Sequence, residues 1–259
     1  MGLMEGKKGL VFGVANDRSY ATFIAKRLLE HGAECGFTYL PLGKMQRRVN
    51  KALEGLGLED PWLVECDAGD DEQLDACFEK FVERFGRIDF IVHSIAFADR
   101  GFLQIGNFHK TSRSAFSQAL DISAYTLVAM TQRAIEHMPE GGSIISMSYY
   151  GGEKVIPGYN VMGVAKAALE HSTRYLAAEL GSKNIRINSI SGGPLRTLAA
   201  SAVGEIDEMF EHHKARAPLQ RNINGEEVGD TAVYLLSDMS SAVTGEVIHV
   251  DSGFNIMGA

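Results

Sequence analysis

Cysteine, long apolar runs and excess positive charge are all scarce in this chain of 259 residues. Its three cysteines, Cys35, Cys66 and Cys77, have no CxxC spacing and no neighbouring histidine cluster, so we expect buried thiols in a reducing compartment and no metal site. No window approaches the roughly 20 apolar residues of a membrane span, and residues 1–10 lack the apolar stretch of a signal peptide. The net charge of −8 disfavours nucleic acid and anionic membranes as partners. These absences predict a cytoplasmic protein.

Short apolar segments alternate with helical segments along the whole chain. The expected helices cover residues 20–31, 44–56, 71–85, 112–137, 159–180 and 226–236, and the expected strands cover 9–12, 34–39, 62–66, 88–94, 143–148, 185–191 and 246–250. The strands are continuously apolar, which indicates a parallel sheet covered on both faces. With no repeat or linker, we predict one α/β domain over residues 1–259, a doubly wound seven-stranded parallel sheet of the Rossmann type.

Two long loops interrupt this rhythm, at residues 96–110 and 192–221. Each follows an expected strand, and the carboxyl ends of parallel strands are where such sheets bind ligands. The second loop precedes the last strand, and its segment 197–213 has the apolar pattern of an amphipathic flap. We expect this segment to be a substrate lid rather than an ordinary surface helix.

The usual dinucleotide fingerprint, GxGxxG, is missing after the first strand. Gly13 is followed by a segment that reaches Ser19, where a helix is expected to begin and could receive a pyrophosphate. Gly13 could instead only turn the chain, and Ser19 could only cap the helix. The second strand ends at Leu40 without the acid that binds an NAD ribose, and no arginine comes before Arg47. We favour NADH over NADPH.

A carboxylate and a histidine follow the next two strands. Asp67 could accept a hydrogen bond from an adenine amino group, or Asp67 or Asp70 could cap the next helix. His93, at the end of the fourth strand, is interpreted as a core residue.

A tyrosine and a lysine follow the fifth strand. Tyr159 and Lys166 are seven residues apart, so a helix would place them on one face across a rise of about 10 Å. The phenol could donate a hydrogen bond to developing negative charge, and the ammonium could hold ribose hydroxyls. A packed tyrosine and a solvated lysine are the alternative.

Several motifs in order resemble the short-chain dehydrogenase/reductase superfamily and, within it, the bacterial NADH-dependent enoyl-acyl-carrier-protein reductases. They cover nearly the full length and lie at residues 13–19, 93–95, 148–151, 159–166, 193–200 and 244–251. Most of the superfamily carries Tyr-x3-Lys with a serine seventeen residues before the lysine. Here Met162 and Tyr149 occupy these two positions, a departure that is the signature of the enoyl reductase branch.

The resemblance implies roles for individual residues. Tyr159 would stabilise an enolate oxyanion, Lys166 would hold the nicotinamide ribose, and Tyr149 would line the acyl pocket and assist proton delivery. Substrate would contact Ala98, Tyr149 and Tyr159. The cofactor would contact Gly13, Ser19, Tyr20, Leu40, Asp67, Ala68, Ile95, Lys166, Leu195, Arg196, Thr197, Leu198 and Ala199, with Leu40 standing where relatives carry a polar residue.

The resemblance also implies the reaction and the partners. The expected activity is NADH-dependent reduction of the trans-2 double bond of an enoyl thioester on acyl carrier protein, in fatty acid synthesis, by a homotetramer. A reductase of a ketone or alcohol is one alternative, disfavoured by the missing Tyr-x3-Lys. A catalytically inactive NAD(P)H-binding sensor is another, disfavoured because Tyr159 and Lys166 are both present.

Overall fold

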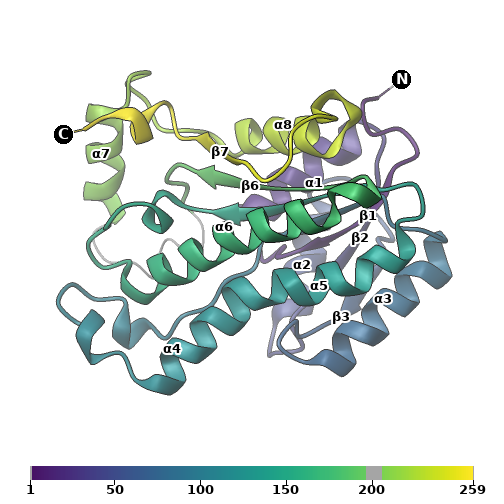
Figure 1. Cartoon of the computed structure of the whole chain (residues 1–259), viewed down its shortest axis with the longest axis horizontal. Helices are drawn as coiled ribbons and strands as arrows, with labels where there is room; N and C mark the ends of the chain where they lie inside the picture. Colours follow the sequence, from purple (N-terminus) through teal and green to yellow (C-terminus); the bar gives the residue numbers. More distant parts are fainter. Residues whose placement is uncertain (1, 197–205, 259) are drawn as a thin grey trace.

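One parallel sheet organises the protein, whose computed structural model describes residues 2–196 and 206–258. The strand order is β3-β2-β1-β4-β5-β6-β7, and every neighbouring pair is parallel. This is the predicted doubly wound sheet (Figure 1). The strands are β1 (Lys8–Phe12), β2 (Glu34–Tyr39), β3 (Leu63–Glu65), β4 (Phe90–His93), β5 (Gly142–Ser148), β6 (Ile185–Gly192) and β7 (Val247–Val250).

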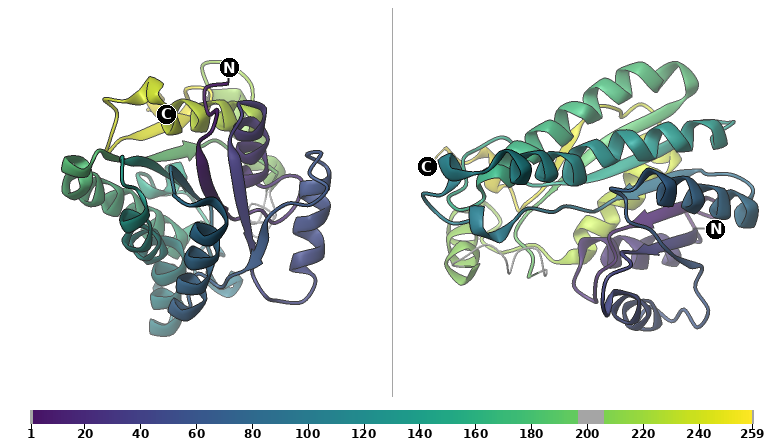
Figure 2. Two further views of the ribbon diagram at one scale, coloured as in Figure 1. Left: turned by 90° about the vertical axis from the view of Figure 1, so that its right-hand side faces the viewer. Right: turned by 90° about the horizontal axis from the view of Figure 1, so that it is seen from below.

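Helices cover both faces of the sheet, as Figure 2 shows. One core cluster packs the sheet against α1 (Tyr20–Glu30), α2 (Met45–Glu54) and α8 (Gly225–Leu236). The other packs it against α3 (Asp71–Phe85), α5 (Thr126–Ala134) and α6 (Asn160–Leu180). Because both faces are buried, the central strands carry apolar residues at consecutive positions, as the sequence indicated.

The long helix expected over residues 112–137 is interrupted. After α4 (Arg113–Leu120), a π-helical turn at Asp121–Tyr125 precedes α5. The turn places the buried Ser123 hydroxyl 3.0 Å from the backbone nitrogen of Phe97, which donates to it. Such turns often mark functional sites, and this one anchors the start of the loop after β4.

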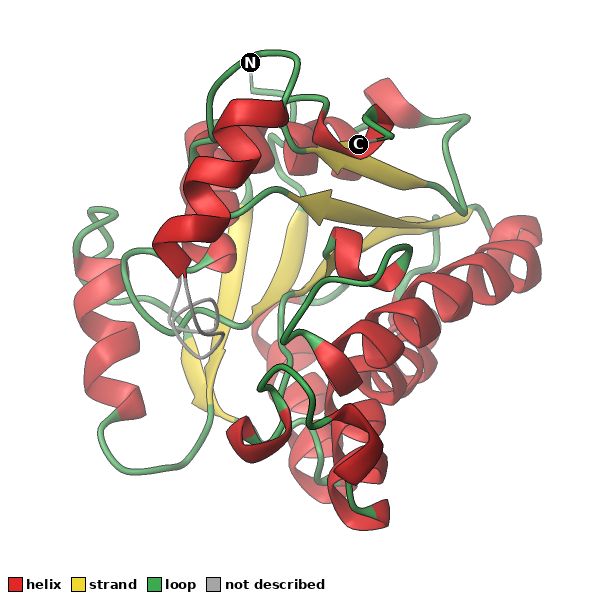
Figure 3. Ribbon diagram, turned by 90° about the vertical axis from the view of Figure 1, so that its left-hand side faces the viewer, coloured by secondary structure: helices red, strands yellow, loops and turns green. Residues whose placement is uncertain are grey.

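The remaining elements stand at the carboxyl edge of the sheet. These are the loop after β4, α4 and α7 (Ile206–Arg216), which follows β6 (Figure 3). Within residues 2–196 and 206–258, no helix is both long enough and apolar enough to cross a bilayer.

Candidate active site

The turn after β1 is built around a glycine. Gly13 has a φ of +105°, and a Cβ there would lie 2.0 Å from the carbonyl oxygen of Ser94. Glycine is therefore required, because it tolerates this φ and lets the ends of β1 and β4 approach. Gly13 therefore does more than turn the chain, which was the alternative that the sequence left open.

Ser19 stands at the N-cap of α1, but its hydroxyl organises the preceding turn. It donates to the backbone oxygen of Asn16 and accepts from the nitrogen of Ala15, at 3.1 and 3.3 Å. Among the described residues, no side chain caps the first amides of α1. A free helix N-terminus beside a close-approach glycine fits an anionic phosphate group.

Tyr20 joins α1 to the segment after β6. Its hydroxyl donates to the carbonyl oxygen of Gly193, and a Cβ on Gly192 would lie 2.9 Å from that hydroxyl. Burial raises the pKa of Tyr20 well above its ordinary value, so the phenol stays neutral. The structure thus brings the first turn and the loop after β6 together.

The expected adenosine contacts lie along the adjoining strand ends. Asp70, not Asp67, caps α3, by accepting from the backbone nitrogen of Gln73. The Oδ1 atom of Asp67 accepts from the nitrogen of Gly69 at 3.0 Å. Leu40, Ala68 and Ile95 are half-buried after β2, β3 and β4.

Tyr159 lies directly before α6. The next residue, Asn160, has a φ of +43°, and its side-chain nitrogen donates to the carbonyls of Phe102 and Gln104 at 2.6 and 2.8 Å. These bonds tie the start of α6 to the loop after β4. Burial, and secondarily the nearby Tyr149, raise the pKa of Tyr159 well above its ordinary value, so its phenol is a neutral hydrogen-bond donor.

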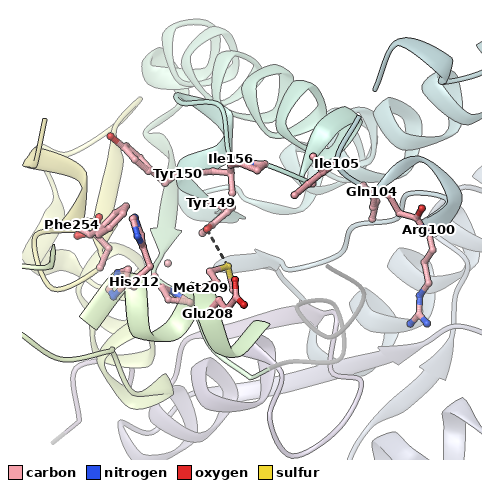
Figure 4. A pocket seen from close by; sticks show the side chains of 18 residues that line it. Arg100, Gln104, Ile105, Tyr149, Tyr150, Ile156, Glu208, Met209, His212 and Phe254 are labelled. Carbon is pink, nitrogen blue, oxygen red and sulfur yellow. Dashed lines mark hydrogen bonds between the residues drawn. The ribbon is translucent and has the colours of Figure 1, made fainter. Parts of the chain in front are cut away.

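Tyr149 and Tyr159 share one site. Their ring centroids are 4.9 Å apart with the planes at 71°. The Tyr149 hydroxyl donates to the sulfur of Met209, on α7, at 3.7 Å (Figure 4). Burial raises the pKa of Tyr149 to about 12. Two neutral phenols, one directly after β5 and one directly before α6, are therefore packed against each other.

Lys166 is buried, not solvated as the alternative interpretation had it. Its side chain is 5% exposed, and its Nζ donates to the carbonyl oxygen of Met147 at 2.7 Å. Burial lowers the pKa of Lys166 to about 8, while the charge of Glu170 acts in the opposite direction. His93 is the predicted core residue: it is fully buried, its Nε2 lies 2.8 Å from the Thr126 hydroxyl, and burial lowers its pKa to about 3.

A cavity of about 860 Å³ opens beside Tyr149. Its walls come from the loop after β4, the segment after β5, the end of β6, α7 and the C-terminal segment (Figure 4). Most of this lining lies in the two loops expected to bind ligands, among it Arg100, Ile105, His212 and His213, although the sequence analysis singled out none of these four residues, and Phe254 lies outside both loops. The aromatic Phe254 near the chain end was an available signal, but only the fold brings it against α7, where its ring stacks on His213 at 4.8 Å.

Ala98 is half-buried and packs with Leu103 and Tyr159 in a small apolar cluster beneath the site. The first part of the expected lid segment, residues 197–205, lies outside the described residues, and this part includes the expected cofactor contacts Thr197, Leu198 and Ala199. The described part of the lid segment is in α7, which supplies Glu208, Met209, His212 and His213 to the cavity wall.

Two more expected cofactor contacts precede that segment. Leu195 is half-buried and Arg196 is exposed. The Arg196 guanidinium pairs with Asp207 and lies 4.8 Å from the ring centroid of Phe210. Across residues 2–196 and 206–258, no cluster of three or more potential metal ligands occurs.

Comparison with known proteins gives one consistent result. Residues 13–255 match the family model described as "Enoyl-(Acyl carrier protein) reductase". The chain is 50% identical to enoyl-[acyl-carrier-protein] reductase [NADH] FabI of Nostoc sp., over 98% of each chain. It is 49% identical to enoyl-[acyl-carrier-protein] reductase [NADH] 1 of Rhizobium meliloti, over 99% of this chain and 93% of the relative.

Solved structures agree. The Bacillus cereus enoyl-acyl carrier protein reductase with NADP+ and indole naphthyridinone superposes with a TM-score of 0.96, at 47% identity, over 100% of both chains. The reductase of Anaplasma phagocytophilum in complex with NAD has a TM-score of 0.94, at 45% identity, over 100% of this chain and 97% of that one.

Proposed function

The chain belongs to the enoyl-acyl-carrier-protein reductase family, and from this membership together with the site we propose how it works. The protein reduces the double bond of an enoyl thioester carried by acyl carrier protein, with NADH as cofactor, in fatty acid synthesis. The observation that carries the residue assignment is the packing of Tyr149 against Tyr159 next to the end of β5, to which the buried Lys166 donates a hydrogen bond.

The residues at the strand ends suit a dinucleotide. The close-approach Gly13 and the uncapped first turn of α1 would receive the pyrophosphate, with Ser19 holding the turn and Asp67 placed for the adenine. Lys166 would hold the nicotinamide ribose. NADH, when bound, supplies the hydride that reaches Cβ of the substrate. The missing acid after β2 leaves Leu40 as an apolar contact for the adenosine.

Tyr159 stabilises the charge that appears on the thioester oxygen. Its neutral phenol donates a hydrogen bond, and the buried site makes that bond stronger than in water. A ketone oxygen is bonded directly to the carbon that accepts hydride, whereas the oxygen of an enoyl thioester is two bonds farther from the hydride-accepting Cβ, so the donor must be displaced. Placing the tyrosine three residues earlier moves its backbone anchor by about 4.5 Å along the helix.

The position of the usual superfamily tyrosine supports this distinction. Met162 occupies it, is 7% exposed and accepts a weak hydrogen bond from the Ser123 hydroxyl at 3.8 Å. A buried thioether has no proton to give a ketone oxygen. This observation weighs against the ketone or alcohol reductase.

Tyr149 completes the acyl pocket and assists delivery of a proton to Cα. Its contact with Met209 links it to α7, so we propose that the described end of the expected lid segment, residues 206–213, covers the cavity. The flexible side chain of Met209 suits an acyl chain of variable length.

The assembly we propose is a homotetramer in the cytoplasm. The outer faces of α5 and α6 form a groove lined by the small or apolar residues Val128, Ala168, Ser172 and Leu176, by the polar His171 and Glu179, and by Tyr175, which is 69% exposed. An exposed aromatic beside small residues favours helix packing between copies.

The decisive experiment follows NADH oxidation at 340 nm with a crotonyl thioester, in parallel with NADPH and with a ketoacyl thioester. We expect turnover with the enoyl thioester and NADH, and little with the ketoacyl thioester. Tight NADH binding without turnover on any enoyl thioester would favour the inactive sensor instead.

A further inference from the structure

Glu170 is a buried carboxylate that the mechanism above does not use. It is 3% exposed, and its Oε1 accepts a hydrogen bond from the Ser148 hydroxyl. It lies four residues after Lys166 on α6, so the two side chains are neighbours on one helix face. An acidic group is rarely buried to this extent unless it is paired.

Two adjacent hydrogen bonds attach α6 to the end of β5. Lys166 donates to the carbonyl of Met147, and Glu170 accepts from the side chain of Ser148. The next residue is Tyr149. The lysine and the glutamate together therefore hold the strand end from which Tyr149 projects.

The same carboxylate also packs under the turn that follows. A Cβ on Gly152 would lie 2.7 Å from the Oε1 of Glu170, and a Cβ on Gly151 would lie 2.4 Å from a ring carbon of Tyr159. The two glycines thus fill the space between the carboxylate and the Tyr159 ring. If Glu170 were displaced, the turn at Gly151 and Gly152 could move, and the packing of the Tyr149 ring against the Tyr159 ring would change.

The charges around this pair have a defined arrangement. Glu170 faces Glu153, Arg174 and His249, and burial raises its pKa while the Ser148 hydrogen bond lowers it. Lys166 lies near Glu170 and the neutral His93. Since burial disfavours the ammonium, a nearby anion is what opposes its loss of a proton.

We propose that Glu170 is a positioning residue. It places its own ionised carboxylate beside Lys166, and it fixes the turn between Tyr149 and Tyr159. This rests on the proposed function only in that Lys166 is assigned to the cofactor. Substrate and cofactor need not touch Glu170.

The test compares Glu170→Gln with wild type, in kcat and KM for NADH and a crotonyl thioester across pH 6 to 10. Removing the anion lowers the pKa of Lys166 further, so the alkaline limit of kcat/KM should move to lower pH by roughly one pH unit or more. Glu170→Asp, which keeps the charge, should retain most of the wild-type limit. Glu83→Gln is the matched control, because it removes one charge from an exposed site on α3.

A second variant and a labelling experiment test the same assignment of Glu170. Ser148→Ala should raise the acidic limit, because Glu170 then takes up a proton at higher pH. Trace acetylation of Lys166, read by mass spectrometry against pH, reports its protonation without any turnover, and its profile should shift in Glu170→Gln.

A purely structural role would lower activity without moving either pH limit or the labelling profile, and that result would overturn the proposal. So would additive effects of Glu170→Gln and Lys166→Met in the double variant, because a residue acting through Lys166 has little left to lose without it. If the wild-type enzyme turns over no enoyl thioester, yet the labelling profile of Glu170→Gln is shifted relative to wild type, the proposed function is refuted and the assignment of Glu170 stands.

Discussion

Replacing Lys166 with methionine should stabilise the apoenzyme while weakening NADH binding. Burial lowers the pKa of Lys166 from 10.5 to about 8, and each pH unit corresponds to about 1.4 kcal/mol, so the charged lysine costs the fold about 3 kcal/mol. The variant also loses the hydrogen bond to Met147, worth ~1 kcal/mol. The net expectation is a gain of about 2 kcal/mol at pH 7.

The difference in the free energy of unfolding between Lys166→Met and wild type should depend on pH. Below pH 8, lysine is charged in both the folded and the unfolded state, and the cost is fully present. Between pH 8 and pH 10.5 the folded state loses the proton first, so the unfolded state binds more protons and wild-type stability rises with pH. Lys166→Met lacks this rise, so its advantage should shrink as the pH increases.

Urea unfolding of the cofactor-free enzyme at one protein concentration, at pH 7 and pH 9.5, measures this difference. The matched control is Lys183→Met, which removes an exposed lysine just beyond α6 and should show neither effect. A Lys166→Met variant that is less stable than wild type at pH 7, or whose difference from wild type does not change with pH, would refute the reasoning.

Three other outcomes follow from the site and the assembly. Tyr159→Phe should lower kcat by ~10–1,000-fold and leave the NADH dissociation constant nearly unchanged, because the lost donor acts on transition-state charge; full activity in stopped assays on every enoyl thioester would show the role to be wrong. Gly13→Ala should destabilise the fold by ~1–3 kcal/mol, because the φ of residue 13 is positive and a Cβ there would clash with the Ser94 carbonyl. It should also weaken NADH binding, measured by fluorescence titration, and an unchanged affinity would show that Gly13 does not contact the cofactor. Light scattering at micromolar concentration should give about four times 28.2 kDa, and a monomer would contradict the tetramer.

Local sequence pattern was sufficient for the architecture. The strand Glu34–Tyr39 and the helix Asp71–Phe85 begin and end at the predicted residues, because their apolar positions follow the periods of a buried strand and of a one-sided helix. The helix expected over residues 112–137 contains a π turn. That turn is stabilised by the hydrogen bond that the backbone nitrogen of Phe97 donates to the Ser123 hydroxyl. The two residues are distant in sequence, so a local pattern cannot predict this bond.

The spacing of motifs was sufficient for the family and for the identity of the principal residues. Tyr159 and Lys166 follow one strand at the spacing that distinguishes enoyl reductases, and the comparisons confirm the family. Sequence reasoning could not say that Lys166 is buried or that Ser19 bonds its own turn. The free energies of these side chains depend on what surrounds them, and the surroundings come from other segments.

The sequence by itself therefore determined the order of strands and helices, the family and the residue types available for chemistry, because these depend on local periodicity and spacing. Only the tertiary structure decided the cavity, the partners of Lys166 and the place of Glu170. Phe254 meets α7, and α6 meets the end of β5, only after chain folding brings them together. Contacts between remote segments set burial and charge, and through them the chemistry that each side chain can perform.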